Sequence, residues 1–193
     1  MTAQIGDVYR HKGVEYDCLK LSDGRLFYPK EHGFHPSAVD TNCWDGYWCE
    51  FEITNVVKLQ TLSIHDKDCR YPPLNGVSIT PRSGTLAFVN PEMIHEKYEN
   101  LDMTMDYTGR ILLADGFIWQ YRINIGLQRP FAYQTLLSVS FEKGVLQEVL
   151  DQSRIAEKLR SIKEEDEALG KDDRYDMPVS RLPQEMRREI WWA

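Results

Sequence analysis

The sequence predicts an α+β fold, in which a mostly antiparallel sheet or partly open barrel is followed by a long C-terminal helix and a short terminal helix. Two observations carry this prediction. Short β-favouring runs separated by Gly, Pro and Asp turn signals fill residues 7–141, whereas apolar residues recur at helical spacing beyond about residue 151. We therefore expect a β-rich globular domain over residues 1–150. Residues 151–193 should form a helical extension that packs on this domain or on a partner.

Three strand-turn-strand patterns predict β-hairpins. Each pattern joins two β-favouring runs through a short segment that contains Asn, Asp or Gly. The predicted pairs are residues 14–21 with 25–28, residues 47–54 with 57–64, and residues 137–141 with 145–146. In the second pair, the apolar parity shifts between Leu59 and Leu62, which indicates a bulge or burial on both faces.

The segment 41–53 combines two tryptophans, a tyrosine, a phenylalanine and two cysteines around an Asp-Gly turn. Its second half alternates strictly, which is typical of a half-buried antiparallel strand. One face carries Tyr47, Cys49, Phe51 and Ile53, and the other carries Trp48, Glu50, Glu52 and Thr54. We expect the first face in the core and the second face toward solvent or a partner.

A mainly apolar run over residues 110–114 ends at Asp115-Gly116 and predicts a central strand buried on both faces. Residues 117–126 fit either a helix or a strand. Proline and glycine predict loops or turns over residues 29–40, 71–76 and 80–84.

The C-terminal part of the chain predicts two helices. The apolar residues at helical spacing are Ile155, Leu159 and Ile162. They predict an amphipathic helix from about residue 151 to about residue 169, which Gly170 can cap. Residues 171–176 have the composition of a solvated linker. Pro183 then precedes a short helix over residues 184–192, whose apolar stripe is Leu182, Met186 and Ile190.

The charge and composition limit the classes of function. The formal net charge of −7 disfavours binding to nucleic acid or to an anionic membrane and favours a basic partner. No segment approaches the roughly 20 consecutive apolar residues of a membrane span. The first residues lack a secretory signal, so we expect a cytoplasmic protein with four free, reduced cysteines. A homo-oligomer is compatible with these features.

Loop histidines and aspartates offer one candidate for chemistry. The residues are His32, His35, Asp40, His65 and Asp66. If they gather at one edge of the sheet, they predict a metal-assisted hydrolase, although surface or hydrogen-bonded histidines are the more frequent outcome. Cys69 near His65 offers a weaker nucleophile candidate.

Other catalytic motifs are absent or incomplete in the sequence. His95-Glu96-Lys97-Tyr98-Glu99 lacks the second histidine of a zinc-protease helix, so we expect an ordinary helical turn there. Phosphate-binding loops and the serine-hydrolase elbow do not occur, and no cofactor is expected.

A second candidate is a contact surface. Interfaces favour tryptophan and tyrosine anchors, and carboxylates would suit a basic partner. The predicted binding residues are Trp48, Glu50, Glu52, Trp191 and Trp192. Docking of the terminal helix on its own core or on a sister subunit is the alternative for the last two. This candidate predicts a binding protein that blocks or scaffolds another protein.

Four segments together carry a resemblance to known proteins: residues 41–53, 71–76, 98–101 and 107–113. The first 150 or so positions resemble small uncharacterised bacterial proteins, some similar to the cytoplasmic immunity proteins that neutralise secreted toxins. The resemblance implies tight binding to a cognate toxin without chemistry. It transfers no individual site residue, because immunity proteins are diverse.

Overall fold

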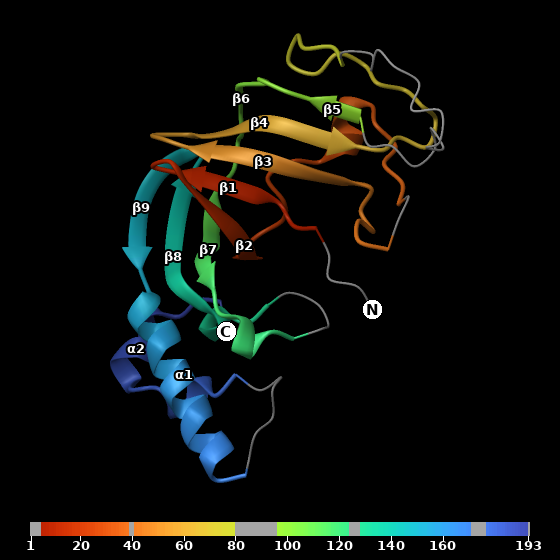
Figure 1. The fold of residues 1–193 in the computed structure, drawn as a ribbon. Coiled ribbons are helices and arrows are strands. Elements are labelled where there is room, and N and C mark those ends of the chain that lie inside the picture. The colour runs from red at the N-terminus through yellow and green to blue at the C-terminus, as the bar shows by residue number, and fades with distance from the viewer. Residues whose placement is uncertain (1–4, 39–40, 80–95, 124–127, 171–176, 193) are drawn as a thin grey trace.

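The computed structural model describes residues 5–38, 41–79, 96–123, 128–170 and 177–192. These residues form one nine-stranded sheet in the order β5-β4-β3-β1-β2-β7-β8-β9, with β6 paired to β4 (Figure 1). The strands are β1 (Val8–His11), β2 (Val14–Leu21), β3 (Tyr47–Ile53), β4 (Val57–Ile64), β5 (Glu96–Tyr98), β6 (Met103–Thr104), β7 (Gly109–Phe117), β8 (Tyr133–Glu142) and β9 (Val145–Asp151). Only β1 and β3 pair in parallel within the described ranges. The predicted α+β fold with a mostly antiparallel, unclosed sheet is therefore confirmed.

Two of the three predicted hairpins are confirmed. β3 pairs with β4, and a register shift opposite Glu50 and Phe51 supplies the predicted bulge. β8 pairs with β9 through Lys143 and Gly144, which both adopt positive φ angles of 49° and 77°. Such a pair of left-handed residues matches the right-handed twist of the flanking strands.

The predicted hairpin between residues 14–21 and 25–28 is wrong. β2 pairs instead with β1, through a turn in which Lys12 and Gly13 have positive φ angles, and with β7 on its other edge. Residues 25–28 are irregular because the backbone N–H of Arg25 donates to the Tyr28 hydroxyl at 2.9 Å. The long-range partner β7 takes the edge that the local pattern assigned to these residues.

The strand alternation of β3 is confirmed. Cys49, Phe51 and Ile53 are buried, whereas Trp48 and Glu50 are only partly buried. The buried side faces an inner core that the curved sheet encloses together with loop residues such as Phe34 and Leu101. The central strand β7 is buried on both faces from residue 111 to residue 114, as its apolar run predicts.

The opposite, outer face of the sheet is covered in part by the C-terminal helices. These are α1 (Ser153–Ala168) and α2 (Gln184–Glu189), which lie together at the β8–β9 end of the sheet and away from β4 and β5 (Figure 1). A second core forms there between the sheet, α1 and the last residues of the chain, including Leu112, Leu136 and Ile155. Gly170 follows α1 with a φ angle of 68°. The helix α2 ends at Glu189, whereas the sequence predicted that it would continue to residue 192.

Three other segments differ from the predictions or lie outside the described residues. Residues 96–98 form β5 and not a helical turn, because Tyr98 is fully buried opposite Leu62 of β4. Within residues 117–126, a short 3-10 helix, η3 (Trp119–Tyr121), follows the end of β7. His95, residues 80–84 and the linker 171–176 lie outside the described residues.

Candidate functional site

The candidate binding surface is the part of the outer sheet face that the described C-terminal segment leaves uncovered, called the uncovered face below. Residues on paired strands that stand directly opposite each other point to the same side of a sheet. One such row runs through Glu50, Val8, Asp17, Ala114 and Leu136. Ala114 and Leu136 lie beneath the C-terminal cover, whereas Asp17 is exposed and Glu50 keeps a third of its side chain exposed. The cover thus reaches Leu19 in the second half of β2, where Lys20 also donates to the Trp192 carbonyl at 2.7 Å, and it leaves Asp17 exposed.

The predicted residues Trp48, Glu50 and Glu52 are partly buried and lie on this part of the face, away from the C-terminal helices. In the next row, Arg10 stands between Glu52 and Glu15 and forms an ion pair with Glu15. Lys97 of β5 lies 3.7 Å from the Glu50 carboxylate, and both partners are partly solvated. Exposed ion pairs of this kind contribute only about 0–1 kcal/mol, so they can be exchanged for contacts with a partner.

A pocket of about 170 Å³ opens at the boundary between the uncovered face and the C-terminal cover. The ladder between β2 and β7 runs from Leu21 to Asp17, and the pocket lies where it stops. The lining residues are Val8, Glu15, Tyr16, Asp17, Ala114, Asp115, Gly116, Phe117 and Tyr133. Three carboxylates and three aromatic rings therefore border one small cavity.

The polar groups of the pocket differ in their partners. The Tyr133 hydroxyl donates to the Asp17 carboxylate at 2.9 Å, and burial, followed by the charge of Asp17, raises the pKa of Tyr133. Glu15 is paired with Arg10. In contrast, the Asp115 carboxylate has no hydrogen bond to another described residue, and neither has the Tyr16 hydroxyl. Of the three pocket carboxylates, only Glu15 forms an ion pair with a described residue.

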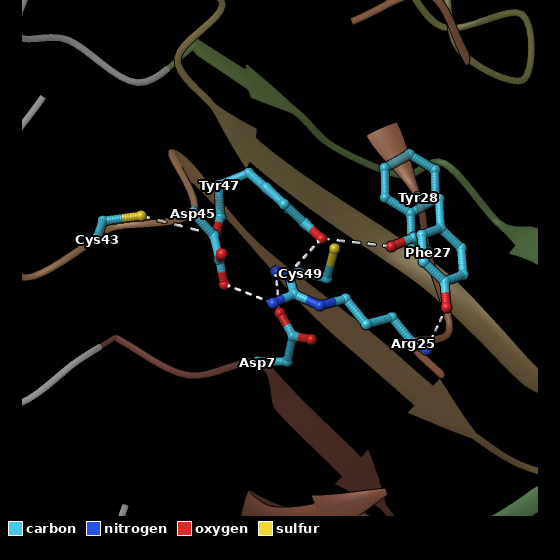
Figure 2. A network of polar contacts seen from close by, with 8 residues as sticks. All are labelled: Asp7, Arg25, Phe27, Tyr28, Cys43, Asp45, Tyr47 and Cys49. Atoms are coloured by element: carbon cyan, nitrogen blue, oxygen red, sulfur yellow. Dashed lines mark hydrogen bonds and ion pairs between the residues drawn. The ribbon is translucent and has the colours of Figure 1, made fainter. Parts of the chain in front are cut away.

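Figure 2 shows a second polar network, at the start of β3. The Arg25 guanidinium donates to the Tyr47 hydroxyl at 2.8 Å and to the Asp45 carboxylate at 2.9 Å. It also lies 5.8 Å from the centre of the Tyr47 ring. Burial raises the pKa of Tyr47 to about 12, so its hydroxyl stays protonated and also donates to the Phe27 carbonyl at 3.4 Å.

Asp7 lies beneath this network and has a different environment. Its carboxylate accepts a hydrogen bond from the Cys49 backbone N–H at 2.8 Å. Burial raises the pKa of Asp7 to about 6, although the Cys49 bond and the charge of Arg25 act in the opposite direction. Asp7 thereby fixes the segment that precedes β1 to β3.

The structure brings His35, His65 and Asp66 together but gives each its own partner. Residues 35–37 run antiparallel to residues 65–67, with a bridge between Pro36 and Asp66. His35 Nδ1 lies 2.6 Å from the Asp68 carboxylate and holds the pKa of Asp68 below its usual range. His65 Nδ1 lies 3.1 Å from the Ser37 hydroxyl.

Asp66 itself is fully buried and organises this loop. Its carboxylate accepts hydrogen bonds from the backbone N–H groups of His35, of Asp68 at 2.9 Å and of Arg70 at 3.3 Å. An anion that receives several backbone donors in this way holds a loop together. The Asp66 oxygens are therefore occupied by the loop itself.

The remaining members of the predicted hydrolase set lie elsewhere. The His32 ring stacks on Phe27 at a centroid distance of 4.9 Å, and Asp40 lies outside the described residues. Across the described ranges, no three His, Cys, Asp or Glu side chains are arranged to hold a metal ion. Cys69 is exposed.

Trp191 and Trp192 contact the body of the chain. The Trp192 indole is 3% exposed and donates to Gln152 at 2.7 Å, and the Trp191 indole donates to the Ser138 hydroxyl at 2.7 Å. Gln152 in turn donates to the backbone of Glu189, so the chain end is fixed to the sheet and to α1. Trp192 leaves little surface for a partner, which agrees with docking of the terminal segment on its own core.

The pocket residues Tyr16, Asp17 and Asp115 were not among the sequence candidates. Alternation along residues 14–21 places Asp17 on a polar face, but its pairing with β7 depends on a strand register that no local sequence pattern predicts.

None of the family models, curated proteins or solved structures compared with this chain matches it. Neither helix in the described residues has the length and apolar character needed to cross a membrane.

Proposed function

We propose that this chain is a small acidic binding protein of the cytoplasm, which captures a basic protein and blocks or scaffolds it in the manner of an immunity or inhibitor protein. The observation that carries the proposal is the outer face of β3, β1 and the first half of β2, which the C-terminal segment leaves uncovered. It presents Trp48 beside Glu50 and Glu52 on β3, and β2 adds Glu15 and Asp17. A single guanidinium, that of Arg10, lies among these four carboxylates on the three strands.

The composition of this face suits a binding process in which carboxylates first attract a basic partner and a tryptophan then packs against it. Acidic groups at the rim of an interface accelerate the encounter with a basic surface, and a tryptophan supplies contact area at its centre. Free cysteines, two of them buried, fit a reducing compartment. The net charge of −7 acts in the same direction at long range.

The test uses charge reversal at two positions on the face. The double variant Glu50→Lys and Glu52→Lys is compared with Glu157→Lys and Glu167→Lys, which makes the same change of net charge on exposed positions of α1. Wild type and both variants are immobilised and exposed to extracts of the source cells. Captured proteins are identified by mass spectrometry, and their association and dissociation rates are measured.

We expect one basic protein to be captured in stoichiometric amount by the wild type and by the α1 variant, and to be lost from the face variant. Its association rate should fall as salt is added, because screening weakens charge steering beyond a distance of about 10 Å at 0.1 M salt. Equal capture by both variants would contradict the assignment of this face. Capture that is unaffected by salt would contradict the role of charge.

A further inference from the structure

We propose that residues 177–192, called the strap below, are a releasable cover over the continuation of the uncovered face, and that the basic partner gains this hidden surface only when the strap opens. This role rests on the proposed function and adds a means of regulating it. The contacts that hold the strap are few, several of them are polar, and they lie beside the uncovered face.

Two tryptophans hold the strap across three strands of the sheet. Lys20 of β2, Leu112 of β7 and Ser138 of β8 stand directly opposite one another, so their side chains point to the same side of the sheet. The Trp191 indole donates to the Ser138 hydroxyl at 2.7 Å. The Lys20 ammonium donates to the Trp192 carbonyl at 2.7 Å. The tryptophan pair therefore crosses β7 at Leu112.

Two buried polar side chains serve the strap. Gln152 is 1% exposed, and its side chain accepts a hydrogen bond from the Trp192 indole and donates to the Glu189 carbonyl at 2.8 Å. The same side chain makes no capping bond to α1. Ser138 is 4% exposed and accepts the Trp191 indole. Since buried polar groups need partners, these two residues form a site that specifically receives the strap.

The strap is nevertheless held less deeply than α1. Within it, only Pro178, Leu182 and Trp192 are buried. The ion pairs between the strap and α1 are formed by partly exposed side chains, and such pairs contribute little to stability. In contrast, α1 buries four apolar residues in the same core. Segments with few buried contacts open locally before the whole fold unfolds, so we expect the strap to leave while α1 stays in place.

Opening of the strap would extend the uncovered face. Asp17, which is exposed, stands directly opposite Ala114, and Ala114 stands opposite Leu136. Leu112, Ala114 and Leu136 share one apolar core with Trp192. A partner that contacts Asp17 would therefore meet a part of this apolar surface once the strap has left.

The strap also has the chemical character of the partner. It contains three arginines, two glutamates and two tryptophans, in a chain whose net charge is −7. A basic protein with an aromatic anchor would compete with such a segment. While the strap is docked, the apparent affinity for the partner is reduced in proportion to the fraction of chains whose strap is open.

Hydrogen exchange of the full chain tests whether the strap opens by itself. Mass spectrometry follows the backbone amides of residues 181–190 and of residues 111–114 in β7, without urea and in about 1 M urea. We expect the strap amides to exchange at least about tenfold faster than those of β7, and urea to accelerate only β7, because a local opening exposes little surface. Equal rates with equal urea dependence would overturn the inference, since strap and sheet would then unfold together.

A double variant tests what holds the strap. Gln152→Ala combined with Ser138→Ala removes the acceptors of both indoles and should accelerate exchange in the strap about tenfold or more. Gln147→Ala combined with Ser161→Ala is the matched control, because these side chains bond to backbone carbonyls of their own strand and helix. Equal exchange of the strap in the two double variants would contradict the role of these anchors.

The surface beneath the strap is tested with the uncharged dye Nile red, which emits strongly on apolar surfaces. Its emission should be at least about threefold higher with the Gln152→Ala, Ser138→Ala variant than with the control, and equal emission would contradict a hidden apolar surface. In the capture experiment, the same variant should bind the basic partner about tenfold more tightly than the control, because more chains are open.

The outcome is separable from that of the proposed function. A basic partner that binds the strap variant and its control equally tightly removes this inference alone. Strap opening and dye binding without any captured basic protein remove the proposed function and leave the strap as the cover of an apolar surface.

Discussion

Replacing Asp7 by Asn should stabilise the protein at neutral pH and remove part of its pH dependence. The Asp7 carboxylate is held among buried groups, and its pKa is raised from 3.8 to about 6. When the pKa of a carboxyl group is higher in the folded state than in the unfolded state, the protonated group stabilises the folded state. This stabilisation is complete at pH values below the unfolded-state pKa and is lost as pH rises through the folded-state pKa. The free energy of unfolding of the wild type should therefore fall between about pH 4 and pH 6.

The magnitude follows from the size of the pKa difference. Each pKa unit corresponds to about 1.4 kcal/mol, so charging Asp7 in the folded state costs about 3 kcal/mol. Asn has nearly the same shape and keeps an oxygen that can accept the Cys49 N–H, the bond that measures 2.8 Å in the wild type. Asp7→Asn should thus raise the free energy of unfolding by about 2–3 kcal/mol at pH 7.5 and by much less at pH 4.

The assay is urea unfolding followed by tryptophan fluorescence at several values between pH 4 and pH 8. Asp106→Asn, at an exposed position, controls for the change of net charge and should stay within about 0.5 kcal/mol of the wild type. A destabilised Asp7→Asn variant at pH 7.5 would refute the reasoning, since it would mean that attraction by Arg25 outweighs the cost of burial. A pH-independent wild type would refute it equally.

Two further predictions concern loops that the strands depend on. Asp66→Ala should lower the free energy of unfolding by about 3–5 kcal/mol in urea melts, because it leaves buried backbone donors unsatisfied. Asp68→Ala is the control: it removes a partly exposed ion pair and should cost about 1 kcal/mol or less. Similar losses of stability in the two variants would contradict the role of Asp66. Gly144→Ala should lower the free energy of unfolding by about 3 kcal/mol or more, measured in thermal or urea melts. The residue has a φ angle of 77°, and an added Cβ would lie 1.9 Å from the Met105 carbonyl oxygen. An unchanged free energy of unfolding would contradict the tight packing of that turn.

Local patterns predicted the parts of the fold that depend on neighbouring residues. The β3–β4 hairpin and its bulge follow from alternation and a change of parity, and the β8–β9 hairpin follows from Lys143-Gly144. The same reasoning failed at Asp23-Gly24. Gly24 does take a positive φ angle of 44°, but a turn alone does not provide a strand partner. The real turn at Lys12-Gly13 precedes a strand, β2, whose other partner is β7.

The candidate site was predictable to a similar extent. Trp48, Glu50 and Glu52 follow from the alternation of one strand, and the structure places them on the uncovered face. The pocket is lined by residues of four strands, β1, β2, β7 and β8, and the register between them cannot be read from sequence spacing. Asp66 was selected for its chemistry, but its burial beneath three backbone donors depends on the long-range approach of residues 35–37.

The position of β2 between β1 and β7 determines how this chain must be assembled. β1 is available immediately, but β7 begins only at Gly109, so one edge of β2 keeps unpaired backbone groups until more than half of the chain has been made. Sheets closed by such distant pairings fold slowly, on a scale of about milliseconds to seconds, and open edges invite association with other chains in the meantime. Fragments that stop before residue 109 should accordingly aggregate, and joining of β2 to β7 should limit the rate of refolding.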